Sequence, residues 1–275
     1  WKFNKRKGML PTSPVRKNIF MAAFALGLLI PVVIIFMREN MNTRVRGRKD
    51  LESVTVPFIG EIPLFTRKKK GIFGKKPQEV KAVVVKEGNR DIINEAFRVL
   101  RTNLEFMTGK DKTSNVIIMT SFNPGSGKSF LTMNIAVSFA IKGKKVLVID
   151  GDLRHGSASS YIDSPARGLS DYLGGRIDNL NEIIVSDPKQ KFMDILPVGT
   201  IPPNPTELLF DERLKQTIDT VREQYDYVLI DCPPIELVAD TQIIEKLADR
   251  TIFVVRAGLL ERSMLAELEK IYGEK

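Results

Sequence analysis

The chain has 275 residues, a net charge of +9 and a single cysteine, so one sizeable domain can form and an intrachain disulfide cannot. Of the 42 Lys and Arg residues, 20 lie before Asp91, and of the 33 Asp and Glu residues, 6 do. The net charge is therefore about +14 before Asp91 and about −5 from Asp91 onward. The globular part therefore has no excess of basic residues for binding nucleic acid, which we exclude as a partner. The basic segment before Asp91 is better suited to anionic lipids at a membrane surface.

An uncharged run at residues 19–37, IFMAAFALGLLIPVVIIFM, predicts one transmembrane helix at residues 18–38. At about 1.5 Å per residue the run reaches roughly 28 Å, close to the thickness of the hydrocarbon core of a bilayer. A signal peptide is a weaker alternative, because the run is long and no A-x-A cleavage pattern follows it. A buried core helix is the other alternative, and Pro31 argues against it.

We interpret residues 39–90 as a basic linker that contains the Lys-rich stretch TRKKKGIFGKK. This stretch is either solvated or in contact with anionic lipid head groups. The pattern changes at Asp91: DIINEAFRVLRTNLEFM carries apolar residues at spacings of 4, 3 and 4, which predicts a helix with one apolar stripe. Residues 91–275 are therefore interpreted as the globular domain.

Short apolar, β-branched runs alternate with helical segments in the rest of the chain. The predicted strands are NVIIMTS, KVLVID, MDILPVG, YDYVLID and TIFVVRA. The predicted helices are 128–141, 212–223, 240–247 and 261–270. Because strands of this kind are buried on both faces, the predicted fold class is α/β, with a parallel β-sheet flanked by helices.

The first predicted strand leads into SFNPGSGKSF at residues 121–130. A strand, a glycine-containing loop and a helix in this order form a phosphate cradle, because the loop amides and the helix dipole point at the anion. The usual pattern, G-x-x-x-x-G-K-[ST], asks for glycine at the position of Phe122, but the structural context outweighs this departure. The residues predicted to bind the nucleotide are Gly125, Ser126, Gly127, Lys128, Ser129 and Phe130.

Carboxylates end two later strands, Asp150 with Asp152 after VLVI and Asp231 after YDYVLI. Ligands bind beyond the carboxyl ends of the strands in parallel α/β sheets. A single Asp at a strand end is usually a cap, but three beside a phosphate loop predict a site that holds Mg²⁺ and accepts a proton. The only histidine, His155, is interpreted as a surface loop residue, and Cys232 as a small buried residue.

The combined motifs resemble those of the bacterial tyrosine kinases, or BY-kinases, a branch of the deviant P-loop ATPases that also contains the MinD/ParA group. MinD/ParA proteins carry a lysine early in the loop, and Asn123 stands at that position here. The matching motifs are E-x-x-R-x-x-R in NEAFRVLRTNL, Walker A′ in VLVIDGDLR, Walker B in YDYVLIDCPP, and GTIPPNPTELL. A membrane span followed by VPFIGEIP also resembles kinases fused to polysaccharide chain-length regulators.

The resemblance implies a cytoplasmic P-loop tyrosine kinase domain at 91–275 that uses ATP, releases ADP and requires Mg²⁺. It implies an extracytoplasmic stub at 1–17 and a location in the bacterial inner membrane. The implied catalytic residues are Lys128, Asp150 and Asp152, with Asp150 as the base that deprotonates the incoming tyrosine. The implied metal ligands are Ser129, Asp152 and Asp231. Three charged residues beside the apolar stripe are expected to be exposed: Glu95, Arg98 and Arg101. The resemblance implies that they join subunits into a homo-oligomeric ring. The alternative is that they form ion pairs within their own helix.

The implied partners are further copies of the chain, membrane lipids, a cognate tyrosine phosphatase and the polysaccharide polymerisation and export machinery. The implied function is autophosphorylation between subunits, which regulates capsular or exopolysaccharide synthesis. Two alternatives stay open: a membrane-tethered ATPase switch of the MinD/ParA type, and an assembly scaffold without tyrosine transfer. The family's acceptors lie in a Tyr-rich tail, so Tyr272 is either the first of them or an ordinary helix-end residue.

Overall fold

The computed structural model describes residues 16–65, 82–109, 115–235 and 240–272. Its internal contacts divide the chain into two compact units, with the boundary between Arg44 and Val45.

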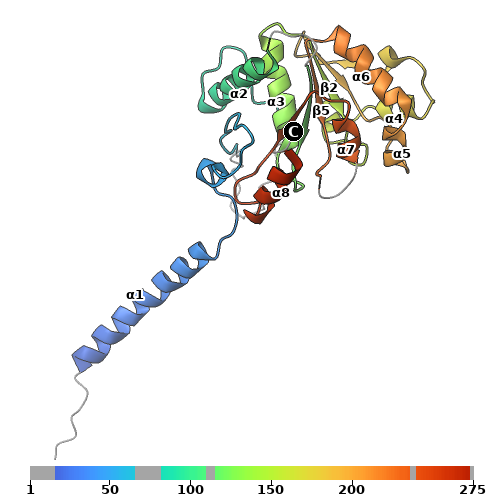
Figure 1. The fold of residues 1–275 in the computed structure, drawn as a ribbon. Coiled ribbons are helices and arrows are strands. Elements are labelled where there is room, and N and C mark those ends of the chain that lie inside the picture. Colours follow the sequence, from blue (N-terminus) through green and yellow to red (C-terminus); the bar gives the residue numbers. More distant parts are fainter. Residues whose placement is uncertain (1–15, 66–81, 110–114, 236–239, 273–275) are drawn as a thin grey trace, which may run out of the picture. The chain divides into compact units, whose positions relative to one another are not determined.

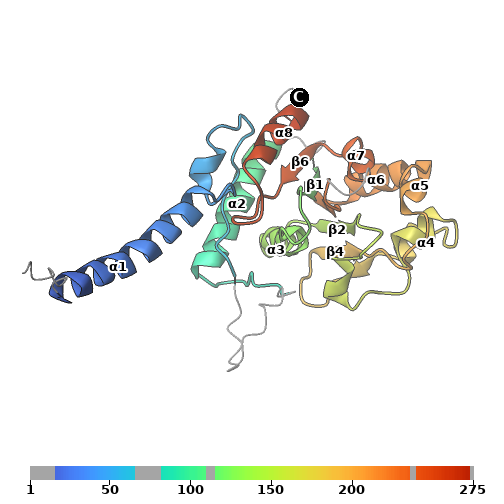
Figure 2. The ribbon, with the colours of Figure 1, turned by 90° about the horizontal axis from the view of Figure 1, so that it is seen from below.

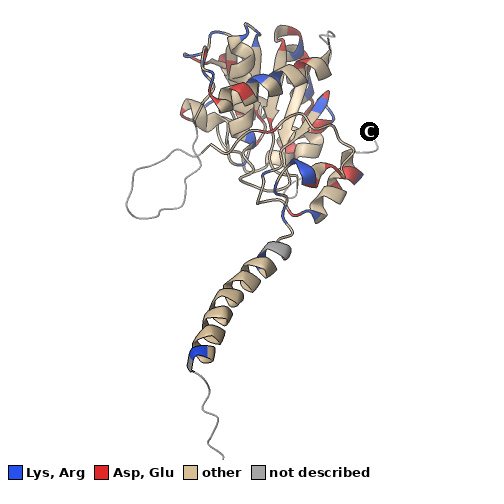
Figure 3. Ribbon diagram, turned by 90° about the vertical axis from the view of Figure 1, so that its left-hand side faces the viewer, with Lys and Arg blue, Asp and Glu red and all other residues tan. Residues whose placement is uncertain are grey.

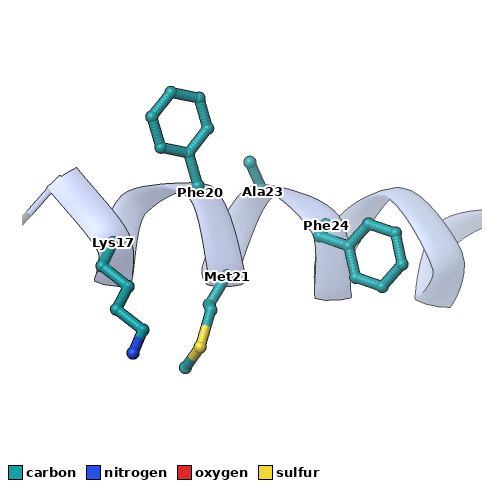
Figure 4. Close-up of a pocket in the computed structure, with 5 residues that line it drawn as sticks. All are labelled: Lys17, Phe20, Met21, Ala23 and Phe24. Atoms are coloured by element: carbon teal, nitrogen blue, oxygen red, sulfur yellow. The ribbon is translucent and has the colours of Figure 1, made fainter.

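The first unit contains α1 (Arg16–Asn40), and its segment Lys17–Arg38 has a mean hydropathy of 2.9. By length and composition this segment can cross a membrane, and none of it is buried inside the protein. Figure 4 shows Lys17, Phe20, Met21, Ala23 and Phe24 projecting outward from the first turns of the helix. In the ribbon of Figure 3, the described part of α1 is coloured as Lys or Arg only near the ends of the helix. The predicted apolar helix of membrane-crossing length is therefore present.

The second unit is built on a six-stranded sheet in the order β3-β4-β2-β5-β1-β6. The strands are β1 (Val116–Thr120), β2 (Val146–Asp150), β3 (Val185–Ser186), β4 (Met193–Leu196), β5 (Tyr227–Asp231) and β6 (Arg250–Phe253). All neighbours pair in parallel except β3 with β4. The five predicted strands and their parallel arrangement are confirmed, and β1, β2 and β5 are buried along their whole length. The edge strand β3 has only two residues, too few to show an alternating apolar pattern from which a strand could be predicted.

Helices cover both faces of the sheet (Figures 1 and 2). The helices of this unit are α2 (Ile92–Thr108), α3 (Lys128–Ile141), α4 (Leu169–Leu173), α5 (Pro205–Leu209), α6 (Glu212–Gln224), α7 (Asp240–Glu245) and α8 (Ser263–Tyr272). Apolar residues of α2 and α3 pack with one set of alternating strand residues, and those of α4 to α7 pack with the other set. The hydrophobic effect on these two faces holds the layers together.

Most of the described part of the predicted linker, residues 45–65 and 82–90, belongs to the second unit, which begins at Val45 and not at the predicted residue 91. The backbone of Val45 exchanges hydrogen bonds with the loop before α8, donating to the Leu260 carbonyl at 2.8 Å and accepting from the Gly258 N–H at 2.8 Å. The Asn134 side chain of α3 accepts the N–H groups of Val84 and Val85. These bonds and buried valines make the segment part of the core. The Lys-rich stretch at 66–76 lies outside the described residues.

Candidate functional site

The loop between β1 and α3 has the backbone shape that the phosphate-cradle interpretation requires. Gly125 and Gly127 have φ angles of 71° and 93°, and Gly127 is the residue before the first turn of α3. A side chain at Gly127 would meet nothing within 4 Å, so the left-handed backbone, not lack of space, favours glycine there. The Ser121 and Ser126 hydroxyls both donate to the Asn123 carbonyl at 2.8 Å, which fixes the start of the loop.

Lys128 is the first residue of α3 and is largely buried. Its ammonium lies 3.4 Å from the Ser121 hydroxyl oxygen, across the loop. The first N–H groups of a helix have no partner within it and carry a partial positive charge. Lys128 adds a full charge at the same place, so this end of α3 is suited to an anion. The predicted phosphate loop thus has both the required backbone and the required charge.

Phe130 is the third residue of α3, and its half-buried side chain packs against the core. Its ring centroid is 6.0 Å from that of Phe97 on α2 and 6.4 Å from that of Phe65. Because these contacts hold the ring, the group of Phe130 that can donate a hydrogen bond to a phosphate is its backbone N–H.

The three predicted carboxylates converge at the carboxyl edge of the sheet. Asp150 and Asp231 end the adjacent strands β2 and β5 and are register partners. Gly151 donates its N–H to the Asp231 carbonyl at 2.9 Å, which turns the chain over β5 and brings Asp152 to the same edge. A Cβ at Gly151 would lie 3.0 Å from Ile230, so this close crossing favours glycine.

Asp231 is buried, and among the described residues neither of its carboxylate oxygens accepts a hydrogen bond of ordinary geometry. Burial, followed by the negative charge of Asp150, raises the pKa of Asp231 to about 8. Ser129 and Lys128 lie close enough to oppose this rise in pKa. A buried carboxylate with open oxygens beside a hydroxyl is a suitable donor set for a hard cation such as Mg²⁺. No cluster of three or more His, Cys, Asp or Glu in the described ranges could hold a metal, so other oxygen ligands would have to complete the shell.

Asp150 differs from Asp231 in that its carboxylate is held by neighbours. Its Oδ2 accepts the backbone N–H and the hydroxyl of Ser159, each at 2.6 Å. Burial raises the pKa of Asp150 to about 6, and the Ser159 hydrogen bonds oppose that rise. Asp150 has no exposed surface in this structure, so a substrate can reach it only in a conformation that uncovers it.

Asp152 lies at the surface end of the carboxylate group. Its Oδ1 accepts the N–H groups of Arg154 and His155 at 3.3 and 3.2 Å. The His155 ring nitrogen Nδ1 is 3.2 Å from both Asp152 oxygens, while the side chain of His155 remains 67% exposed. The prediction of a surface loop histidine is confirmed, and its contact with Asp152 had no signal in the sequence.

A second polar cluster, which the sequence did not reveal, joins the loop after β2 to the helices α5 and α7. Arg154 donates through Nε to Asp240 Oδ2 at 2.9 Å, and the Thr206 hydroxyl donates to Asp240 Oδ1 at 2.7 Å. Thr206 lies within the motif GTIPPNPTELL, which was the available signal. The cluster fixes the loop that carries Asp152 to α5 and α7.

The three charged residues of α2 have partners within the chain. Arg98 is paired with Glu95 and donates to the Asn89 carbonyl at 2.6 Å. Arg101 donates to the Ser138 carbonyl of α3 at 2.8 Å. Only Glu95 is exposed and the two arginines are half-buried, so the expectation that all three are exposed is corrected. The partners of Arg98 lie on α2 and just before it, whereas Arg101 reaches α3.

Comparisons with known proteins agree with this geometry. The family described as an AAA domain matches residues 114–268. The tyrosine-protein kinase Wzc of Salmonella typhimurium is 34% identical over 256 residues, which are 88% of this chain and 34% of Wzc. The solved BceF tyrosine kinase domain is 40% identical, with a TM-score of 0.58 over 64% of this chain and 70% of that one. The kinase domain of Escherichia coli tyrosine kinase ETK is 29% identical, with a TM-score of 0.68 over 82% and 86% of the two chains. The chain spans about a third of the length of its curated relatives.

Proposed function

Because the chain belongs to the bacterial tyrosine kinases with a P-loop ATPase fold, we propose that it transfers the γ-phosphoryl group of ATP to tyrosine residues of further copies of itself. The observation that carries the proposal is the placement of Lys128 and the open, buried carboxylate of Asp231 at one edge of the sheet. A metal-bound nucleotide requires a phosphate loop that carries a cation, beside a carboxylate whose oxygens are open; those of Asp231 accept no hydrogen bond of ordinary geometry from the described residues.

The phosphates of ATP would be held by the backbone of the loop that includes Gly125, Ser126 and Gly127, and by the first turn of α3. Lys128 would contact the β- and γ-phosphates as a positive charge. Mg²⁺ would be held by Ser129 and Asp231, and by Asp152 directly or through water, and it would neutralise charge on the phosphates. The product of the same site would be ADP.

Asp150 is proposed as the base. A tyrosine hydroxyl is a poor nucleophile while protonated, because its pKa is near 10. In the transfer, the tyrosine oxygen forms a bond to the γ-phosphorus, the bond from that phosphorus to the β–γ bridging oxygen breaks, and the hydroxyl proton passes to Asp150. Since Asp150 is fully buried here, this step requires a conformation that exposes its carboxylate.

Assembly would bring an acceptor tyrosine of one copy to the site of another. We propose a homo-oligomeric ring in which Glu95, Arg98 and Arg101 form part of the contact. The apolar helix α1 would anchor each copy in the bacterial inner membrane, with lipid around it and the kinase domain in the cytoplasm. A tyrosine phosphatase and the machinery for capsular or exopolysaccharide synthesis and export are the further partners proposed.

The test is to incubate the detergent-solubilised chain with ATP, Mg²⁺ and a Tyr-rich acceptor peptide, beside a Lys128→Met variant. We expect phosphotyrosine with the unchanged chain and none with Lys128→Met, while circular dichroism shows that both are folded. Phosphotyrosine that persists in Lys128→Met would show that the site is assigned wrongly. Free phosphate without phosphotyrosine would instead identify an ATPase switch or scaffold.

A further inference from the structure

Ser159 occupies a position beside Asp150 that the proposed roles leave unexplained. It begins the short 3-10 helix Ser159–Ile162, nine residues after Asp150 in the chain. Its backbone N–H and its hydroxyl both reach Asp150 Oδ2 at 2.6 Å. Ser159 is 3% exposed and Asp150 has no exposed surface, so both hydrogen bonds lie in a region shielded from water. Hydrogen bonds to a carboxylate under these conditions are among the stronger ones in proteins.

The direction of the Ser159 hydroxyl proton follows from a third contact. The N–H of Val198 donates to Ser159 Oγ at 2.9 Å. A hydroxyl has one proton to donate, and the Val198 N–H already occupies an acceptor position on the oxygen, so the proton points to Asp150. Val198 is itself fixed, because its carbonyl accepts the Ser170 N–H at 2.9 Å. The side chain of Ser159 is therefore oriented from two sides.

The two buried carboxylates at this edge are consequently held in different ways. Both Asp150 Oδ2 contacts come from Ser159, and Oδ1 has a longer contact, 3.3 Å, with the Asp152 N–H. Asp231, its register partner, has no comparable hydrogen bond among the described residues. The open oxygens of Asp231 are available to a cation, whereas the Ser159 contacts hold Asp150 in one orientation, as a base that presents one oxygen to its substrate requires.

We propose that Ser159 is a positioning residue for phosphoryl transfer, which holds Oδ2 of Asp150 so that Oδ1 is the oxygen that receives the tyrosine proton. This inference rests on the proposed function, in which Asp150 is the base. Ser159 touches neither ATP nor tyrosine in this scheme and acts only through the orientation of Asp150.

The experiment measures initial rates of phosphotyrosine formation on the acceptor peptide by the full, detergent-solubilised chain. Ser159→Ala removes the hydroxyl, and Ser159→Thr keeps it. The matched control is Ser160→Ala, because the Ser160 hydroxyl donates to the Ser157 carbonyl and not to a carboxylate. We expect Ser159→Ala to lower kcat about tenfold or more, the scale expected for loss of a hydrogen bond to a charged group. KM for ATP should stay within about twofold, since Ser159 does not touch the nucleotide.

Ser159→Thr should recover most of the rate, and Ser160→Ala should leave kcat unchanged. An unchanged kcat in Ser159→Ala, or a loss that Ser159→Thr shares in full while its unfolding temperature is unchanged, would overturn the inference. If Ser159→Ala does not fold, Ser159→Cys takes its place, because a thiol keeps the volume and donates only weakly. Asp150→Asn distinguishes failure of the proposed base from failure of the proposed role of Ser159. If Asp150→Asn still forms phosphotyrosine, Asp150 is not the base. If Asp150→Asn is inactive while Ser159→Ala is fully active, only the role of Ser159 is wrong.

Discussion

Replacing Asp231 with Asn keeps the shape of the side chain and removes an ionisable carboxyl group whose oxygens accept no hydrogen bond of ordinary geometry from the described residues. Burial and the negative charge of Asp150 raise the pKa of Asp231 to about 8. In the unfolded chain an Asp has a pKa of about 3.9. Between these two values the folded protein binds a proton that the unfolded chain has released. Asp231→Asn should therefore stabilise the nucleotide-free domain at neutral pH although it removes a proposed metal ligand.

The size of the effect follows from that one proton. Stability from the protonated carboxyl is fully present below pH about 3.9 and is lost as the pH rises toward the folded pKa. The contribution of Asp231 to the free energy of unfolding should fall by about 1.4 kcal/mol per pH unit in this window. From about pH 5 to about pH 7 the difference between Asp231→Asn and the unchanged chain should grow by about 3 kcal/mol in favour of the variant.

The assay is urea unfolding of the detergent-solubilised chain without nucleotide, followed by far-ultraviolet circular dichroism at both pH values. Asp240→Asn is the matched control, because Asp240 is equally buried but is paired with Arg154 and Thr206. It should lower the free energy of unfolding at pH 7, since it breaks a satisfied ion pair. The reasoning would be refuted if the difference between Asp231→Asn and the unchanged chain stayed constant across the pH range, or if Asp231→Asn were the less stable at pH 7.

Two further variants test the assembly and the packing behind the site. Changing Glu95, Arg98 and Arg101 together to Ala should convert the oligomer into a monomer in light scattering after size exclusion; an unchanged mass would contradict their role in the contact. Gly199→Ala should cost more than about 3 kcal/mol in urea unfolding, because its φ is +79° and a Cβ would lie 2.3 Å from the Asp171 carboxylate. Gly88→Ala, with a φ of +72° and open space around it, should cost only about 1 kcal/mol, and equal losses would contradict the packing argument.

The sheet could be predicted from the sequence because its information is local. A strand such as Val116–Thr120 is apolar at every position, and the phosphate loop that follows it depends on glycines a few residues apart. The parallel order then places the ends of β2 and β5 side by side, which explains why Asp150 and Asp231 could be placed together without coordinates. The local preference of each strand and of the turn that follows it therefore agrees with the overall fold.

The attachment of residues 45–65 and 82–90 to the domain could not be predicted in this way. These segments form no long periodic element, and several of their hydrogen bonds are made with residues far along the chain, among them side-chain amides. Asn134, about 50 residues later, accepts the N–H groups of Val84 and Val85, and Asn103 donates to the Ile59 carbonyl at 2.7 Å. A single asparagine in a helix leaves no sequence pattern from which its hydrogen-bond partner could be predicted. The hydrogen bonds of Ser159 and the Arg154 cluster were missed for the same reason.

The departure from the usual phosphate-loop pattern at Phe122 also has a structural explanation. The non-glycine residues with positive φ in the described ranges are Asp163 and Ser164, so the backbone at Phe122 is one that any side chain can adopt. The Phe122 ring is buried at 3% exposure and lies edge-on to Phe253 at 4.8 Å. Leu260 and Val45 belong to the same apolar cluster, so the first position of the loop is anchored to β6 and to the segment after α1. Glycine is needed where the loop turns back at Gly125 and Gly127, and the position before that turn is free to contribute to the core.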